Sequence, residues 1–153
     1  MRRLADDLDI RAPSIYKHLA GKHAIEVALI EVAFLENGEA LHAAIENAEP
    51  QTAIVHLLRA YRRLGLHQPN LYRLATAGTL PRAELSPGLE EWAGEPFFLV
   101  AGEAHLAQAL WSFAHGMVIL EIDGRYPEGL DLDRTWTAGA AAFEAARTGS
   151  NPR

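Results

Sequence analysis

Four polar side chains that could contact a nucleic acid fall within two helical turns near the start of the sequence. They supply a hydroxyl, a phenol, an ammonium and an imidazole: Ser14, Tyr16, Lys17 and His18. Hydroxyl and ammonium groups bind phosphate oxygens, and donors on the same surface can reach base edges. Because Ile15 and Leu19 would be buried, the spacing predicts a helix from Pro13 to about Leu19 that presents the polar set to a major groove.

A short helix and a turn precede this polar set. Leu4 and Leu8 share one side of a predicted helix that ends at Asp9. A helix-turn-helix needs a left-handed backbone at this point, and Asp tolerates that region better than most residues, although less well than Gly. Pro13 fits the first turn of the second helix, where no N–H is needed. The stretch from Leu4 to Lys22 is therefore predicted to be two helices joined by a tight turn.

Charge is distributed unevenly along the chain. The whole sequence has 14 Lys and Arg against 20 Asp and Glu, which argues against a general nucleic-acid coat. Residues 1–23 nevertheless carry a net charge of +2, whereas residues 24–153 carry −8. Both lysines of the protein, Lys17 and Lys22, lie in the opening segment. A basic head on an acidic body favours local contact with DNA, although short basic helix pairs also occur in other all-α proteins.

The stretch LADDLDIRAPSIYKHLAGKHAI resembles the DNA-binding segment of the tetracycline-repressor (TetR-type) family. In that family a turn leads into a recognition helix of the form P-[ST]-x-Y-x-H, and a Lys opens the next long helix. The matching positions are Pro13, Ser14, Tyr16, His18 and Lys22. Asp9 stands where the family usually has Gly, and Arg11 where it often has Ser or Thr. The resemblance implies a homodimeric transcriptional regulator that binds a palindromic operator in double-stranded DNA.

The same resemblance suggests which residues contact DNA. Arg2 and Lys17 are candidate base-reading residues, and Arg11 is a further candidate contact. The phosphate contacts would be Ser14, Tyr16, His18 and Lys22. The family's first helix, which covers the apolar side of the pair, does not precede Met1. Either the start of the sequence is misplaced or truncated, or the head is incomplete. An incomplete head is expected to be loosened over residues 1–22 and to bind DNA weakly or not at all.

Helical periodicity continues through the rest of the sequence and predicts an all-α fold. Helices are expected at residues 23–47, with a possible bend near Gly38, and at 51–66, 70–76, 103–122 and 132–147. Residues 77–96 contain several Gly and Pro, so loops or a broken helix around 89–93 are expected there. This pattern divides the chain into a head with its connecting helix, residues 1–47, and a ligand-binding and dimerisation domain, residues 48–153.

The last two predicted helices have the composition of a dimer interface. The first is apolar on more than one face, and the second has small residues at every third or fourth place, which allows close approach of another helix. Candidate interface residues are Leu110, Met117, Gly139 and Phe143. The resemblance implies that the family dimerises through such a pair. Trp111, His115 and Gly116 also resemble a Trp–His–Gly pattern found in one subfamily.

Aromatic residues of the body are candidates for the wall of a small-molecule pocket. These are Tyr61, Trp92, Phe97, Phe98 and Trp111, together with His115. The hypothesis is a repressor that an unknown small-molecule effector releases from DNA, because the effector favours a state in which the two recognition helices are wrongly spaced. No cofactor is expected.

Two other functions compete with this hypothesis. The first is an all-α binding or sensor protein with a vestigial head. The second is a small helical enzyme using His115, since Ser112 lies three residues away on the same helix. No catalytic third group is readable near them, and the histidine spacings do not suggest a metal site. The regulator, which is not an enzyme, is therefore preferred.

Composition restricts the compartment and the chemistry. The absence of cysteine excludes disulfides, thiolate metal sites and a cysteine nucleophile. No apolar run reaches the length of about 18 residues that a membrane-spanning helix needs, and no leader sequence is evident. The sequence therefore predicts a cytoplasmic protein with no membrane partner.

Overall fold

The computed structural model describes residues 21–149, which form six α-helices and one short 3-10 helix. The prediction of an all-α fold is confirmed. The predicted helix-turn-helix lies almost wholly outside the described residues. Within the described part of the chain, no helix is both long enough and apolar enough to cross a membrane.

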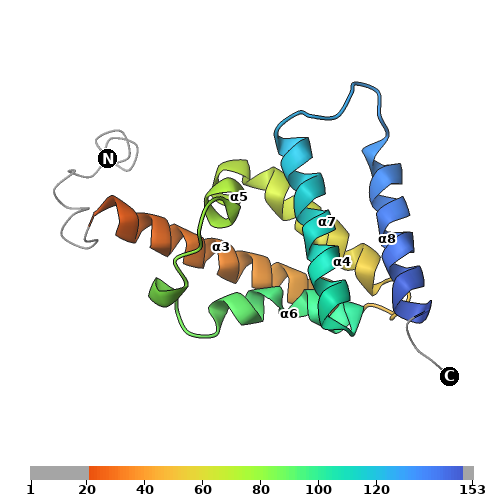
Figure 1. Cartoon of the computed structure of the whole chain (residues 1–153), viewed down its shortest axis with the longest axis horizontal. Helices are drawn as coiled ribbons and strands as arrows, with labels where there is room; N and C mark the ends of the chain where they lie inside the picture. Colours follow the sequence, from red (N-terminus) through yellow and green to blue (C-terminus); the bar gives the residue numbers. More distant parts are fainter. Residues whose placement is uncertain (1–20, 150–153) are drawn as a thin grey trace.

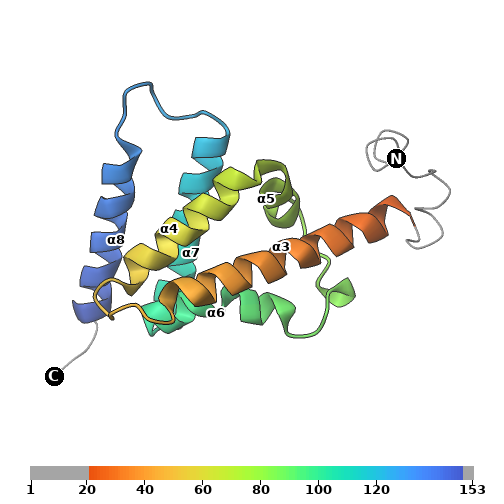
Figure 2. The same ribbon diagram turned by 180° about the vertical axis from the view of Figure 1, so that it is seen from behind.

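The longest helix, α3 (Lys22–Ile45), confirms the predicted connecting helix. Its 24 residues span roughly 36 Å at 1.5 Å per residue. Gly21 precedes it with a φ of 127°, a backbone conformation that glycine adopts at little cost. The N-terminal end of α3 points away from the other long helices, whereas its C-terminal half lies among them (Figures 1 and 2).

Gly38 does not break α3, because the helix continues through it. Its role is close packing. A Cβ atom at this position would lie 2.2 Å from Cζ3 of Trp92, far inside van der Waals contact. The missing side chain therefore lets the Trp92 ring lie directly against the α3 backbone.

Helices α4 (Ala53–His67) and α5 (Pro69–Thr76) match the predicted boundaries closely. Each is amphipathic, and α4 buries Ile54, Leu57 and Leu58. Pro69 occupies the first turn of α5, where its missing N–H leaves no carbonyl unpaired. Both helices pack against α3, and α4 also contacts α6, α7 and α8.

The prediction for residues 77–96 is wrong in its second half. Only residues 77–88 are irregular, including the 3-10 helix Arg82–Glu84, and a full helix, α6 (Leu89–Ala101), follows. Pro96 lies inside α6 and cannot donate to the carbonyl of Trp92, its partner in a regular helix. His42 of α3 donates its Nε2–H to that carbonyl at 3.1 Å. A side chain from another helix thus satisfies the acceptor that the proline leaves free.

Helices α7 (Ala104–Ile122) and α8 (Leu132–Gly149) lie side by side and run in opposite directions (Figures 1 and 2). The Glu103 carboxylate caps α7 by accepting from the backbone N–H groups of His105 and Leu106 at 2.9 and 2.8 Å. Gly139 of α8 faces the ring of Phe113, where an added Cβ would lie 2.1 Å from Cζ. Close approach of these two helices therefore occurs within one chain.

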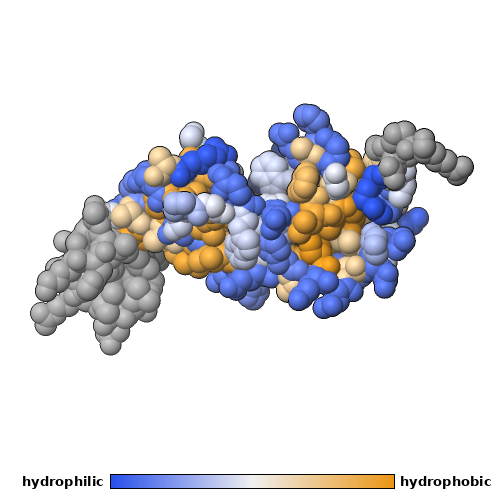
Figure 3. All heavy atoms as spheres, turned by 90° about the horizontal axis from the view of Figure 1, so that it is seen from below, coloured by the Kyte–Doolittle hydropathy of each residue, from blue (hydrophilic) through white to orange (hydrophobic). Residues whose placement is uncertain are grey.

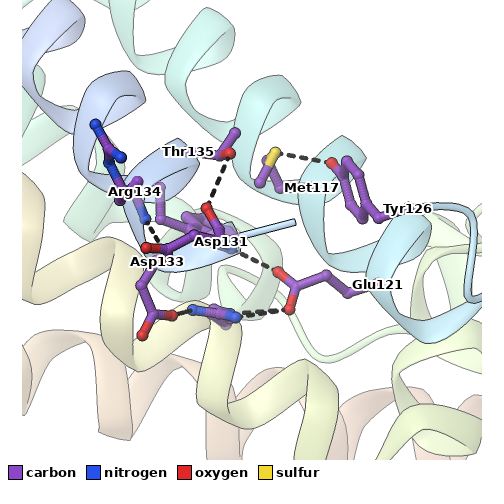
Figure 4. Close-up of polar contacts among 9 residues, drawn as sticks. Met117, Glu121, Tyr126, Asp131, Asp133, Arg134 and Thr135 are labelled. Carbon is purple, nitrogen blue, oxygen red and sulfur yellow. Dashed lines mark hydrogen bonds and ion pairs between the residues drawn. The ribbon is translucent and has the colours of Figure 1, made fainter. Parts of the chain in front are cut away.

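A polar network joins α4, α7 and α8 at the end where the α7–α8 loop begins (Figure 4). The Arg62 guanidinium donates to Glu121 at 2.8 and 3.0 Å and to Asp133 at 2.5 Å. The indole N–H of Trp136 donates to the other oxygen of Glu121. The nearly buried Glu121 carboxylate thus has a charged partner and a neutral donor, which offsets the cost of removing it from water.

The buried apolar residues form two separate clusters. The larger one joins α4, α6, α7 and α8 with the C-terminal half of α3 and includes Leu41, Leu57, Leu110 and Val118. The smaller one contains only Val27, Ile30 and Leu85, with three partly buried neighbours. Seen from below, the surface also has two apolar regions with a hydrophilic band between them (Figure 3).

Candidate functional site

A cavity of about 580 Å³ lies between α3, α5, α6 and α7, with residues 77–82 forming one side. Its volume falls in the range of small-molecule sites. The α3 helix contributes Ile30, Phe34, Asn37 and Leu41. The wall therefore includes both the N-terminal and the C-terminal half of the helix that leads to the head.

The structure brings four of the six predicted pocket residues to this cavity: Tyr61, Phe97, Phe98 and Trp111. Two do not line it. Trp92 packs against Gly38 and stacks on His42, with ring centroids 5.2 Å apart. The His115 ring stacks on Trp111 and Tyr72, which do line the cavity.

The deep part of the cavity has an aromatic floor. Tyr61 meets Phe97 edge to face at 5.4 Å between centroids, and it meets Tyr72 in the same way at 5.9 Å. All three side chains are buried. Such packing fixes the rings and makes this side of the cavity rigid.

A short hydrogen-bonded chain connects this floor to His115. The hydroxyls of Tyr61 and Tyr72 are 2.9 Å apart, and the Tyr72 hydroxyl is 2.8 Å from Nδ1 of His115. Burial raises the pKa of Tyr61 to about 12 and raises that of Tyr72 as well, so both phenols stay protonated at neutral pH. Burial also lowers the pKa of His115, which favours the neutral imidazole. A neutral Nδ1 can accept the Tyr72 proton, so all three groups are satisfied without a charge.

The rim of the cavity has one ion pair. Arg82 donates from Nε and Nη2 to the two carboxylate oxygens of Glu90, each at 2.7 Å. Glu90 raises the pKa of Arg82 through these hydrogen bonds and through its charge. No other charged side chain lines the described wall.

Sequence analysis missed Tyr72, Arg82, Glu90 and the α3 residues as parts of this site. Tyr72 is eleven residues from Tyr61, and their contact depends on the turn at Gln68 that joins α4 to α5. Arg82 and Glu90 are eight residues apart across an irregular segment. The helix end at Gln68 and the irregular segment interrupt the helical period between these positions, so their spacing in the sequence does not group them.

Among the predicted DNA contacts, only Lys22 is in the described part of the chain. It is the first residue of α3, is largely exposed, and pairs with Glu26 at 2.9 Å. The other predicted contacts lie outside the described residues: Arg2, Arg11, Ser14, Tyr16, Lys17 and His18.

The four predicted dimer residues have neighbours inside the chain. Leu110 is fully buried, and Met117 is buried and accepts from the Tyr126 hydroxyl at 3.0 Å. Gly139 and Phe143 both contact Phe113. Leu110 and Met117 are thus buried within the chain, whereas Gly139 and Phe143 stay partly exposed, and their place in a dimer interface remains a prediction.

Ser112 and His115 do not form a catalytic pair. The Ser112 hydroxyl donates to the carbonyl of Gln108 at 2.8 Å, while Nδ1 of His115 faces Tyr72. Between residues 21 and 149, no group of three acidic or histidine side chains is placed to hold a metal ion.

Comparisons with known proteins agree with this architecture. Residues 54–143, more than half of the chain, match the family model for the tetracyclin repressor-like C-terminal domain. No curated protein matches the chain significantly in sequence.

Two solved structures share the fold. One is described as the "putative regulatory protein SCO4313"; it is 20% identical, with a TM-score of 0.72 over 93% of this chain and 83% of that one. The other is a protein of unknown function from Rhodococcus sp. RHA1; it is 22% identical, with a TM-score of 0.75 over 95% of this chain and 82% of that one. At these identities the likeness concerns the fold alone.

Proposed function

Because the chain belongs to the tetracyclin repressor-like family, we propose that it is a DNA-binding transcriptional regulator, a cytoplasmic repressor that a small molecule releases from its operator. The observation that carries this proposal is the position of the cavity. It lies between the family's C-terminal domain and α3, the helix that follows the proposed DNA-binding residues. A molecule bound there would contact both parts.

DNA recognition is assigned to residues 2–22. In this proposal a homodimer presents two recognition helices to successive major grooves about 34–36 Å apart. Lys17 and Lys22 are the two lysines of the chain, and cations that neutralise phosphates make binding strongly dependent on salt. The pairing of Lys22 with Glu26 is exposed, so DNA could compete for this ammonium at little cost.

Residues 77–88 are the proposed connection between the ligand and the head. At one end, Leu80 and Arg82 line the cavity. At the other end, Glu84 bonds to His23 at 2.8 Å and the backbone N–H of Ser86 donates to Glu31 at 2.6 Å. A ligand that shifts this segment would shift the contacts that hold the N-terminal half of α3, and so bias the spacing of the two heads.

Dimerisation is assigned to the outward faces of α7 and α8. Ala138, Ala141 and Ala145 are exposed in the single chain, and Leu120 is exposed as well. A Cβ at Gly116 would meet nothing within 4 Å, so this face of α7 is open. Two copies of such faces could pack closely as an antiparallel four-helix arrangement.

The dimer is tested by sedimentation velocity at micromolar concentration. Ala141→Glu should give monomers, whereas Ala83→Glu, on the exposed 3-10 helix, should leave the dimer unchanged. Gly139 is unsuitable for this test, because any side chain there would collide with Phe113 inside the subunit. A wild-type protein that sediments as a monomer would refute the proposal.

The regulatory function is tested with DNA from around the protein's own gene. Fluorescence anisotropy should detect one fragment bound with steep salt dependence, and the doubly substituted Lys17→Ala, Lys22→Ala protein should bind it far less tightly. Arg63→Ala removes an exposed charge from α4 and should have no effect. Equal binding by the wild type and the double variant would contradict the proposal. Absence of DNA binding together with ligand binding would favour a sensor instead.

A further inference from the structure

The described residues of the cavity wall carry no net charge. Its two charged side chains, Arg82 and Glu90, bind each other through two hydrogen bonds of 2.7 Å. The pair lies at the rim, where the Arg82 side chain is 67% exposed, and every other described side chain of the wall is uncharged. A charged molecule in contact with that uncharged part of the wall would lose water without gaining a counter-charge, which is unfavourable. The wall therefore selects against both anions and cations.

Aromatic side chains dominate the remaining wall. Six of them line the cavity from five helices: Phe34, Tyr61, Tyr72, Phe97, Phe98 and Trp111. Phe98 and Trp111 keep 50% and 44% of their surface exposed, which is unusual for such large apolar groups. A flat apolar molecule between them would remove this surface from water, at about 25 cal/mol per Å² buried.

Polar groups on the wall are neutral and few. The paired hydroxyls of Tyr61 and Tyr72 lie at the aromatic floor. The other neutral polar side chains of the described wall are Asn37, Thr76, Thr79 and Gln108. Because Tyr72 donates to Nδ1 of His115, Tyr61 donates to Tyr72, and the Tyr61 oxygen can accept from a donor atom of a ligand.

We infer that the effector is an uncharged aromatic molecule of drug-like size whose polar atom bonds to the tyrosine hydroxyls. This inference rests on the ligand site of the proposed function and specifies its chemistry. The paired charges of Arg82 and Glu90 disfavour charged ligands. The exposed rings of Phe98 and Trp111 provide apolar contact area for the ligand.

Two dyes with the same ring system test the selection by charge. N-phenyl-1-naphthylamine is neutral, and 8-anilino-1-naphthalenesulfonate carries one negative charge. In fluorescence titrations of the whole chain without DNA, the neutral dye should bind at least about tenfold more tightly. Trp111→Ala should weaken its binding, whereas Leu130→Ala, an exposed apolar site away from the cavity, should not.

A substitution in the ion pair provides the sharper test. Glu90→Gln leaves Arg82 as an uncompensated cation at the rim, so affinity for the sulfonated dye should rise about tenfold while the neutral dye is little affected. Glu128→Gln removes the same charge from an exposed position that does not line the cavity and leaves the Arg82–Glu90 bonds intact. It should leave the preference for the neutral dye unchanged.

The outcomes separate this inference from the proposed function. Tighter binding of the sulfonated dye by the wild type, an unchanged preference in Glu90→Gln, or no binding of either dye would each overturn the ligand class. If the neutral dye binds as expected but does not dissociate the protein from its operator, the inferred ligand class is supported, whereas the proposal that such a ligand releases the repressor is refuted.

Discussion

The two ends of α3 are held in very different ways. Its C-terminal half belongs to the main core, where Leu41 is 1% exposed and Gly38 lies under the Trp92 ring. Its N-terminal half contributes only Val27 and Ile30 to a cluster completed by Leu85. Among the described residues, most of the packing free energy of α3 is therefore at one end, and the end that leads to the proposed DNA-binding residues buries less apolar area.

The two histidines of α3 repeat this contrast. His42 is partly buried and satisfies the Trp92 carbonyl that Pro96 leaves free. His23 is exposed and bonds to the exposed carboxylate of Glu84. One therefore replaces a missing backbone hydrogen bond in the packed region, and the other forms a surface contact whose strength depends on pH.

The largest effect is expected from truncating the core at the fixed end. Leu41→Ala should lower the free energy of unfolding by about 2–5 kcal/mol, because it creates a cavity among fully buried neighbours. Ile30→Ala at the other end should cost less, near the lower limit of that range, because Ile30 packs in a much smaller described cluster, with Val27 and Leu85 as its buried neighbours. Urea denaturation measures both values. Equal losses would remove the distinction between the two ends.

A smaller effect is expected from filling the contact between α3 and α6. Gly38→Ala places a methyl group inside the Trp92 ring, and such overpacking should cost about 1–3 kcal/mol. Gly94→Ala on the facing helix is the matched control. Its Cβ would meet nothing within 4 Å, so the substitution should stabilise the helix by about 0.5–1 kcal/mol. The thermal unfolding temperature should fall in Gly38→Ala and rise in Gly94→Ala. A change in the same direction in both variants would contradict the proposed packing.

Removing the His42 imidazole should have a still smaller effect. His42→Ala leaves the Trp92 carbonyl without its donor, and a cost of about 1 kcal/mol is expected because the site is partly open to water. His105→Ala, at an exposed site on α7, should cost nothing measurable. The proline provides a second check: in a Pro96→Ala background, residue 96 regains its N–H, so His42→Ala should cost less than it does alone.

Local patterns predicted most helices but not the contacts between them. Periodicity predicted α3, α4, α5, α7 and α8 because apolar residues recur at helical spacing in each of them. Helix α6 was predicted only as loops or a broken helix around residues 89–93, because Gly94 and Pro96 are normally helix breakers. The hydrogen bond that compensates for Pro96 comes from His42, more than fifty residues away in the sequence. No local rule contains that information.

The candidate site was predicted in part for the same reason. Tyr61, Phe97, Phe98 and Trp111 were identified because large aromatic residues commonly line apolar pockets. Small residues on α8 correctly indicated a close helix contact at Gly139, but the contact is with Phe113 of the same chain. Sequence spacing predicts that a helix approaches closely, and it does not distinguish a helix of the same subunit from one of a partner.

The smallest predicted effect concerns pH at the weakly held end of α3. The hydrogen bond and the charge of Glu84 raise the pKa of His23 above its ordinary value. The contact therefore contributes its full stabilisation below the pKa of the unfolded chain, near 6.5, and loses it as pH rises through the raised value. Amide exchange at residues 23–27, corrected for the intrinsic effect of pH, should become faster between pH 6 and pH 8.

Glu84→Gln separates this contact from other effects of pH. In that variant the NMR-measured pKa of His23 should fall toward its ordinary value, and the corrected exchange rates at residues 23–27 should become nearly independent of pH. Exchange at residues 39–43 should be the same in both proteins, because His42 bonds to a carbonyl that does not titrate. If the exchange rates at residues 23–27 and 39–43 changed equally with pH, the contact between His23 and Glu84 would not act specifically on the N-terminal half of α3. If instead the pH dependence were confined to residues 23–27, Glu84 would be identified as one residue through which the segment 77–88, beside the cavity, stabilises the N-terminal half of α3.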